Sequence, residues 1–178
     1  MEHEVRRAQP DELDKVIEII ESGRAYLKAQ GVPQWQNGTG PGPEEAKVDV
    51  ARGYGYVLEV EGDAKGYATL IPGPEGSPEL AEGAWNGSCE QYTTIHRVAI
   101  DASARGSGFA GAFIAGMVQI AGELGYPDIR IDTHPKNEIM QKVIARNGFI
   151  EVGVLELPFT DGKRLAYQLL LEEDTWQS

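Results

Sequence analysis

Cysteine and long apolar runs are the scarcest features of this 178-residue chain. The single cysteine, Cys89, has no partner for an internal disulfide, which favours a reducing compartment. No segment is apolar for long enough to span a bilayer, and residues 1–15 lack the apolar centre of a signal peptide. We therefore expect a cytoplasmic protein with no membrane partner.

Basic residues are also scarce: 16 Lys and Arg stand against 28 Asp and Glu, which gives a formal net charge of -12 at pH 7. Nucleic-acid binding needs a basic surface that neutralises phosphates, so we expect no nucleic-acid partner. A negative field attracts cationic amines, which is compatible with a small-molecule amine as substrate. Simple solubility is the alternative reason for such a charge.

Length and composition predict one domain that spans residues 1–178, because a chain of this size with 41% hydrophobic residues can bury its own core. Hydrophobic periodicity and the positions of Gly and Pro divide it into strands and helices. Strands are expected at 3–8, at 54–71 as a hairpin, and at 91–100, 128–134, 149–159 and 163–173. Helices are expected at 10–31, 43–53, 108–125 and 137–148. This order predicts a mixed sheet with helices on both faces.

Local signals add detail to these elements. Gly23 is expected to break the first helical segment into two helices. The pair Gly62-Asp63 supplies turn residues for the hairpin. Asn137 is expected to cap the last helix, and Gly148 to end it.

The segment ARGSGFAGAF, residues 104–113, contains the spacing G-x-G-x-x-G at Gly106, Gly108 and Gly111. This spacing is typical of dinucleotide-binding loops, and Asp132 lies about where such a fold places its acidic residue. In that fold the first glycine follows directly on a buried strand. Here the five residues DASAR separate the strand from Gly106, and the rest of the chain is too short for a six-stranded doubly wound sheet. The pattern therefore argues against a dinucleotide.

A P-loop is excluded as well, since no Lys-Ser or Lys-Thr follows the glycines. Gly106 and Gly108 still let backbone amides converge at the start of a helix, which favours a pyrophosphate. Arg105 adds a positive charge at the mouth of this loop. A strand-to-helix turn softened by glycine and holding no ligand is the alternative.

Two blocks of the sequence, taken in order, resemble the GNAT family (GCN5-related N-acetyltransferases). RVAIDASARGSGFAGAF, residues 97–113, resembles the family's acetyl-coenzyme A segment, in which a hydrophobic strand and a short polar loop precede R-G-x-G-x-[GA]. RIDTHPKNEIMQKVIARNGFIEVG, residues 130–153, resembles the next block, in which a strand, an Asn and a helix ending in Gly-Phe follow. The matching positions are Arg105, Gly106, Gly108 and Ala110 in the first block and Asn137, Gly148 and Phe149 in the second.

The resemblance implies an α/β (α+β) fold: a single GNAT-like domain with a mixed, mostly antiparallel sheet, a central parallel pair and helices on both faces. It implies an N-acetyltransferase that moves an acetyl group from acetyl-CoA, its cosubstrate, to a primary amine of a small molecule, by direct transfer in a ternary complex and without a metal. Family members are often homodimers. A non-catalytic acyl-CoA-binding module of the same fold stays open as an alternative. A relative that acylates aminoacyl-tRNA is disfavoured by the acidic charge.

By the same resemblance, the cofactor lies where strands 94–100 and 129–133 splay apart. The backbone of Val98, Ala99 and Ile100 is implied to pair with the pantetheine arm as an added strand. The side chain of Asn137 is implied to contact the cofactor further along. The pyrophosphate is implied to bind the loop amides of Arg105, Gly106, Ser107, Gly108, Phe109 and Ala110.

Acetyl transfer needs a group that accepts the proton of the amine. His96 is the first candidate, because it lies two residues before the run that pairs with the cofactor. His134, at the end of the 128–134 strand, is the second, and Asp132 and Glu90 acting through water are further candidates. The alternatives are a buried His96 that orients its strand and a His134 that caps a loop.

Trp35 and Ile144 are two further positions of interest. Trp35 lies on the Gly/Pro-rich loop 32–43, which by the resemblance frames the acceptor pocket, so we expect it to stack on substrate. A Trp that anchors this loop is the alternative. Ile144 stands where many family members carry a Tyr that protonates the leaving thiolate. Either another group supplies that proton, or the thiolate leaves unassisted.

Overall fold

The computed structural model describes residues 1–74, 79–87 and 91–172, so the candidate Glu90 and the cysteine Cys89 lie outside the described residues. Its strands are β1 (His3–Arg7), β2 (Gly55–Val60), β3 (Asp63–Pro72), β4 (Glu82–Gly83), β5 (Tyr92–Ile100), β6 (Asp128–Thr133), β7 (Ile150–Glu156) and β8 (Lys163–Leu170). Its α-helices are α1 (Leu13–Ala29), α2 (Pro43–Ala51), α3 (Phe109–Glu123) and α4 (Glu138–Arg146).

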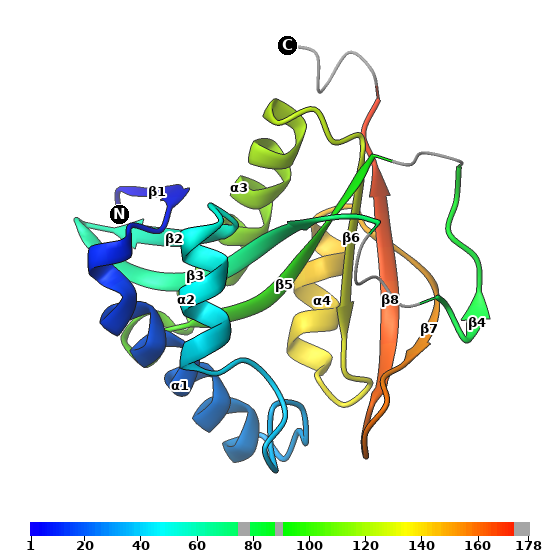
Figure 1. Ribbon diagram of the computed structural model, residues 1–178, viewed down its shortest axis with the longest axis horizontal. Helices are drawn as coiled ribbons and strands as arrows, with labels where there is room; N and C mark the ends of the chain where they lie inside the picture. The colour runs from blue at the N-terminus through cyan, green and yellow to red at the C-terminus, as the bar shows by residue number, and fades with distance from the viewer. Residues whose placement is uncertain (75–78, 88–90, 173–178) are drawn as a thin grey trace.

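Within the described part of the chain, the strands form one sheet in the order β1-β2-β3-β5-β6-β8-β7-β4. Only β5 and β6 run parallel, and every other neighbouring pair described is antiparallel. Figure 1 shows α1 and α2 on one face of the sheet and α3 and α4 on the other. The expected mixed sheet, with a central parallel pair and helices on both faces, is confirmed.

Each face of the sheet has its own hydrophobic core. On the α3/α4 face, Phe113 and Met117 of α3 and Ile144 of α4 are fully buried against the strands. On the α1/α2 face, Ile19 and Ile20 of α1 pack in a second cluster. Burying two apolar layers stabilises the sheet from both sides, because each layer removes apolar surface from water.

Gly23 does not break the first helix, contrary to the expectation. α1 is continuous from Leu13 to Ala29, and Gly23 is buried within it. A Cβ at Gly23 would lie 2.8 Å from the Cβ of Ala99 on β5 and 3.3 Å from the ring of Trp35. The glycine therefore serves close packing of helix on strand, which helical periodicity alone does not reveal.

The hairpin between β2 and β3 turns one residue earlier than expected. Val60 pairs with Asp63, so the two-residue loop is Glu61 and Gly62. Both have positive φ, at 50° and 86°. Two consecutive left-handed residues match the twist of the flanking strands, as in a type I′ turn.

β5 and β6 separate part-way along their length. Their parallel pairing runs from Tyr92 with Asp128 to Ile95 with Ile131 and ends there. Beyond that point β5 stays paired with β3, and β6 stays paired with β8. Figure 1 shows the two strands diverging from a common end. The sheet is therefore split between them.

A bulge in β5 lies beside this split. His96 pairs with Thr69 and Ala99 pairs with Tyr67, so two residues of β5, Arg97 and Val98, stand opposite one residue of β3. Arg97 has a φ of 58°, and the hydroxyl of Thr69 donates to the carbonyl of His96 at 3.1 Å. A bulge leaves its extra residue outside the ladder and bends the strand.

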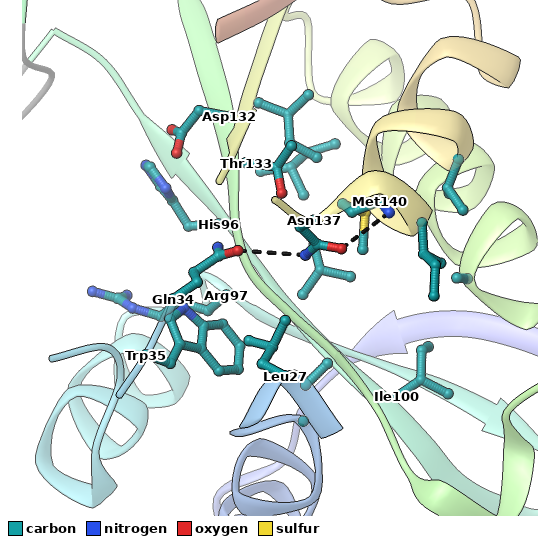
Figure 2. Close-up of a pocket in the computed structure, with 18 of the residues that line it drawn as sticks. Leu27, Gln34, Trp35, His96, Arg97, Ile100, Asp132, Thr133, Asn137 and Met140 are labelled. Carbon is teal, nitrogen blue, oxygen red and sulfur yellow. Dashed lines mark hydrogen bonds between the residues drawn. The ribbon is translucent and has the colours of Figure 1, made fainter. Parts of the chain in front are cut away.

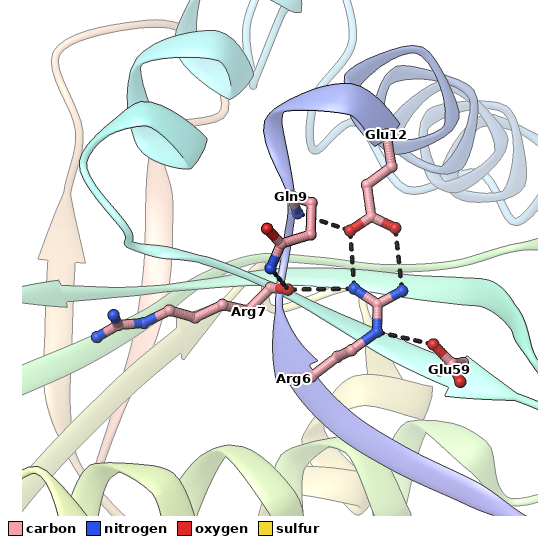
Figure 3. A network of polar contacts seen from close by, with 5 residues as sticks. All are labelled: Arg6, Arg7, Gln9, Glu12 and Glu59. Carbon is pink, nitrogen blue, oxygen red and sulfur yellow. Dashed lines mark hydrogen bonds and ion pairs between the residues drawn. The ribbon is translucent and has the colours of Figure 1, made fainter.

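Arg6 ties the first strand to the start of α1 (Figure 3). Its Nη1 and Nη2 donate to the two carboxylate oxygens of Glu12 at 2.8 and 3.1 Å, and its Nε donates to Glu59 at 2.7 Å. The backbone N–H of Gln9 also donates to Glu12, at 2.6 Å. The hydrogen bond from Arg6 holds the pKa of Glu12 below its usual range. These contacts fix the angle at which the chain enters α1.

The close approach at Gly23 predicts that Gly23→Ala lowers the free energy of unfolding by about 1–3 kcal/mol, because α1 must shift away from Ala99. Gly111→Ala in α3 is the matched control, since a Cβ there meets nothing within 4 Å. It should raise the free energy of unfolding by about 0.5–1 kcal/mol through helix propensity. Urea denaturation measures both, and equal stabilisation by the two substitutions would contradict the packing role of Gly23.

Candidate functional site

A cavity of about 1010 Å³ opens where β5 and β6 separate. Its wall comes from α1 and the loop after it on one side of the sheet, and from α3, α4 and the loop before α3 on the other. In Figure 2, Leu27 and Trp35 from the first side and Asn137 and Met140 from the second border the same space. The cavity therefore passes through the split sheet, so ligands bound on its two faces can meet inside it.

The loop between β5 and α3 forms one end of the cavity, through Gly106 and Gly108 among others. Both glycines have positive φ, at 81° and 77°. A Cβ at either position would meet no atom within 4 Å, so the space in front of the loop is open. Gly108 precedes α3 and offers no side-chain cap to the first turn of the helix. Such a helix start suits an anion, and the residues fit a pyrophosphate.

The guanidinium of Arg105 holds this loop against α1. Its Nη2 donates to the carbonyl and hydroxyl of Ser22 at 2.7 and 3.0 Å and to the carbonyl of Ile100 at 2.8 Å. The guanidinium carbon also lies 4.2 Å from the centre of the Tyr26 ring. The side chain expected to add a positive charge at the mouth of the loop thus positions the loop. Of the six loop residues expected there, all but Ser107 line the cavity.

The run expected to pair with pantetheine has one open edge. Val98, Ala99 and Ile100 all line the cavity. Ala99 and Ile100 pair with β3 on one side, while the pairing with β6 has already ended. An extended ligand can use such an edge for backbone hydrogen bonds.

Asn137 caps α4 as expected and also reaches across the cavity. Its Oδ1 accepts from the backbone N–H of Met140 at 3.2 Å, and its Nδ2 donates to Oε1 of Gln34 at 3.4 Å (Figure 2). Gln34 lies on the loop after α1, so this contact joins the two sides of the cavity. No local motif indicates Gln34, because the contact joins residues 103 positions apart.

His96 and Asp132 are the first residues beyond the last β5–β6 pair. Both line the cavity, and Figure 2 shows the side chains of His96, from β5, and Asp132, from β6, directed to the same side of the sheet. Burial, with a smaller contribution from Arg97, lowers the pKa of His96 to about 4. Burial raises the pKa of Asp132 to about 6, opposed by the positive charge of Arg164. At pH 7.5 the imidazole is therefore neutral and the carboxyl group ionised.

His134 lies away from the cavity. It is buried and does not line the cavity wall, and its Nδ1 accepts the backbone N–H of Lys136 at 3.0 Å. The side chain thus holds the turn between β6 and α4. This matches the capping role that was its alternative.

Trp35 both anchors its loop and lines the cavity. It is buried, with a φ of 68°, and its ring packs close to Gly40. Its carbonyl accepts a hydrogen bond from Arg24, which also donates to the carbonyls of Thr39 and Pro41. The loop is therefore held by α1, and the ring forms a fixed apolar part of the wall.

Ile144 is fully buried in the α3/α4 core and does not line the cavity. Thr133 does line it, and its hydroxyl is buried without a hydrogen-bond partner among the described residues. An unpaired buried hydroxyl is costly, so a ligand in the cavity could satisfy it. Thr133 was not predicted, because strand sequence alone does not show which hydroxyls lack partners.

Two arginines that line the cavity, Arg97 and Arg164, were not predicted as site residues from the sequence. Arg97, at the bulge, donates through Nη1 to Asp49 of α2, which pairs its charge. Arg164 of β8 is only 4% exposed, and its Nη1 donates to the backbone carbonyls of Asp161 and Lys163 at 2.7 and 2.8 Å. Cross-strand register brings Arg164 to the site, and no local motif indicates it.

Neither a metal site nor a membrane span is present in the parts of the chain that the structure describes. No three His, Cys, Asp or Glu residues there lie together as metal ligands. No helix there is long and apolar enough to cross a bilayer.

The family model of the GNAT acetyltransferases matches residues 25–149. The chain belongs to the GNAT acetyltransferase family. A solved GNAT-family acetyltransferase from Streptococcus agalactiae is 34% identical, with a TM-score of 0.84 and 96% of each chain covered. Another from Listeria monocytogenes is 22% identical, with a TM-score of 0.76 and 96% of each chain covered.

A more distant GNAT-fold neighbour was solved with a ligand. RimL, a ribosomal L7/L12 alpha-N-protein acetyltransferase in complex with coenzyme A, is 16% identical with a TM-score of 0.64. The alignment covers 95% of this chain and 94% of RimL. No curated protein sequence matched this chain.

The raised pKa of Asp132 predicts a pH-dependent stability change in Asp132→Asn. An unfolded Asp has a pKa of about 3.9, so above pH 6 the folded state carries a carboxylate that burial disfavours. Asparagine removes that charge, and the free energy of unfolding should rise by on the order of 2–3 kcal/mol at pH 7.5. The gain should shrink as pH falls from 6 to 4 and vanish below that.

Urea denaturation at pH 7.5, 5 and 3.5 measures this effect. Asp128→Asn, two residues earlier on β6, is the matched control, because Asp128 is fully buried and paired with Arg130 at 3.0 Å. That substitution should destabilise the protein at pH 7.5, since it leaves Arg130 buried without its partner. A loss of stability in Asp132→Asn at pH 7.5 would contradict the burial of an unfavourable charge.

Proposed function

We propose that this protein is an acetyl-CoA-dependent N-acetyltransferase that acts on a primary amine of a small molecule. The observation that carries the proposal is the cavity that connects the glycine loop before α3 with His96 and Asp132 beyond the split. Acetyl-CoA would supply an activated acetyl thioester there. Membership of the GNAT family and the coenzyme A complex of the neighbour RimL support this cosubstrate.

Direct transfer in a ternary complex fits the cavity best. One continuous space reaches both faces of the sheet, so donor and acceptor can be bound together. The described residues that line it include no Cys or Ser that would serve as an acyl-enzyme nucleophile. Alignment of the two substrates alone supplies a large part of the rate acceleration.

The cofactor residues keep the roles expected from the family. The amides of residues 105–110 hold the pyrophosphate, and Asn137 lies further along the same cavity. The open edge of Val98 to Ile100 pairs with the pantetheine arm. We assign the backbone N–H of Val98, one of the two bulge residues, to polarise the thioester carbonyl.

His96 accepts the proton that the amine must lose. The nitrogen lone pair attacks the thioester carbon, a C–N bond forms, and the C–S bond breaks with its electron pair going to sulfur. His96 is neutral at pH 7.5 because burial lowers its pKa, and it lines the cavity, whereas His134 does not. A thiolate is a modest base, so its departure requires no acid at Ile144, and it takes its proton from solvent.

A non-catalytic acyl-CoA-binding module of the same fold is the second candidate, favoured by the burial of Ile144 where many relatives carry a Tyr. Other parts of the proposal rest on composition and family. The net charge of -12 supports the absence of a nucleic-acid partner. We further propose one cytoplasmic acetyltransferase domain over residues 1–178, without a metal and assembling as a homodimer.

The glycine loop predicts that Gly108→Val weakens coenzyme A binding by at least about tenfold. A valine at a φ of 77° strains the loop and fills the space in front of the amides. Isothermal titration calorimetry measures the dissociation constant, with Gly125→Val as the control, because Gly125 has a φ of 91° and open space before it but does not line the cavity. Unchanged affinity in Gly108→Val would place the pyrophosphate elsewhere.

The role of His96 predicts that His96→Gln lowers kcat by about 100-fold, since it removes a general base. Its affinity for coenzyme A should stay within about twofold of the wild-type value. Thiol release from acetyl-CoA with a panel of amines measures kcat, and calorimetry measures the affinity. Full activity in His96→Gln would exclude it as the base, and no thiol release with any amine in the wild type would favour the binding module.

A further inference from the structure

Arg164 stands apart from the other arginines that line the cavity. Arg97 pairs with Asp49, Arg105 holds the glycine loop against Tyr26 and Ser22, and Arg146 is exposed at the end of α4. The guanidinium of Arg164 is buried, yet no described carboxylate lies within 4 Å of it. Arg164 is therefore a buried cation of the cavity wall that is available for an anion.

The hydrogen bonds of Arg164 leave one edge of its guanidinium group without a partner among the described residues. Its Nη1 is used by the carbonyls of Asp161 and Lys163, and its Nε and Nη2 have no partner among the described residues. Neither nitrogen is sealed off inside the protein, since the buried unpartnered atoms found in the described residues are those of Tyr67 and Thr133. The free edge therefore opens to the cavity that Arg164 lines. A guanidinium edge of this kind matches a carboxylate.

Asp132 lies at a fixed spacing from Arg164. Asp132 pairs with Ala166 across the β6–β8 ladder, so Arg164 is its diagonal neighbour on the same face of the sheet. Diagonal neighbours have Cα atoms about 7–8 Å apart, which leaves room for one small ligand to bridge the two side chains. The site thus offers one anion and one cation side by side, next to His96.

Resting on the proposed acetyltransferase function, we propose that the acceptor is a free amino acid whose carboxylate binds Arg164 and whose ammonium group binds Asp132. Once the ammonium group has released one proton to water, the neutral amine is held beside His96, which accepts the second proton as the C–N bond forms at the split where the thioester would lie. A zwitterion also carries no net charge, so the strongly acidic protein does not repel it.

The wall beside this pair is apolar. Ile71, Leu157 and Phe159 line the same cavity, and the ring of Phe159 lies 5.9 Å from the guanidinium carbon of Arg164. An apolar side chain buries its surface against such a wall, whereas a charged side chain would lose hydration there. We therefore place amino acids such as leucine and phenylalanine among the accepted substrates.

The test compares amino acids with the amines that lack only their carboxylate: leucine with 3-methylbutylamine, and phenylalanine with phenethylamine, within a panel of all common amino acids. Thiol release from acetyl-CoA gives kcat/KM for each. In the wild type, at least one amino acid should be preferred over its matched amine by about tenfold or more, as expected for a charge-assisted pair. Arg164→Met should abolish that preference by raising KM for the amino acid alone.

Arg130→Met is the matched control. Arg130 projects from the same face of the sheet and is similarly buried, but it is paired with Asp128 and stacked on Tyr92 and Trp85 outside the cavity. Its replacement should cost stability and leave the ratio of amino acid to amine unchanged. If Arg164→Met does not fold, Arg164→Lys provides the reading, because a lysine keeps the charge but loses the planar fork and should give an intermediate ratio.

Equal or better use of every matched amine by the wild type, or an unchanged preference in Arg164→Met, would overturn the proposal. Calorimetry with coenzyme A present separates a failure of amino-acid recognition from a failure of the proposed acetyltransferase function. Binding of an amino acid that Arg164→Met weakens, without thiol release, would leave the recognition intact and refute the catalysis. Thiol release with amines alone would support the acetyltransferase function and refute the recognition of amino acids by Arg164.

Discussion

The parallel pairing of β5 and β6 ends after Ile95 and Ile131, and the rest of the site depends on that ending. Because each strand keeps its other neighbour, the split does not unravel the sheet. The core under α3 and α4 packs against strands of both halves, and the core under α1 and α2 packs against β2, β3 and β5. The sheet can therefore lose a ladder at its centre and still hold a cavity there with fixed walls.

Polar side chains line this opening, where β5 and β6 each have an unpaired edge. His96 and Asp132 follow directly on the last β5–β6 pair. Burial lowers the pKa of His96 and raises that of Asp132, and both shifts favour the neutral form of the side chain. At pH 7.5 the buried carboxylate of Asp132 reduces the stability of the free protein, whereas the neutral imidazole of His96 does not. A cationic ligand that pairs with Asp132 recovers part of the lost free energy.

Most of the fold was predictable from the sequence, because periodicity and turn residues mark elements such as α4, with its cap Asn137. The glycine loop was also predictable. Its turn requires left-handed backbone at two positions, and glycine, here Gly106 and Gly108, adopts that conformation without strain. Gly23 was misread, because a glycine that permits close packing looks the same in sequence as one that ends a helix. The positions of Arg164 and Gln34 in the cavity wall could not be predicted, because tertiary contacts and not a local motif bring each residue there.

Arg130 and Arg164 show how one sheet face divides into structure and site. Both are buried on the same face of neighbouring strands, but Arg130 lies beside the paired segment of β5 and β6, where Asp128 and Gln168 share a hydrogen-bonded cluster with it. Arg164 lies level with the part of β6 that follows the last β5–β6 pair, and no carboxylate of the described residues is within 4 Å of its guanidinium. The guanidinium of Arg130, beside the paired segment, is therefore fully paired, whereas that of Arg164, beyond that segment, has donors available for a ligand. The register at which β5 and β6 part decides which arginine can meet a ligand.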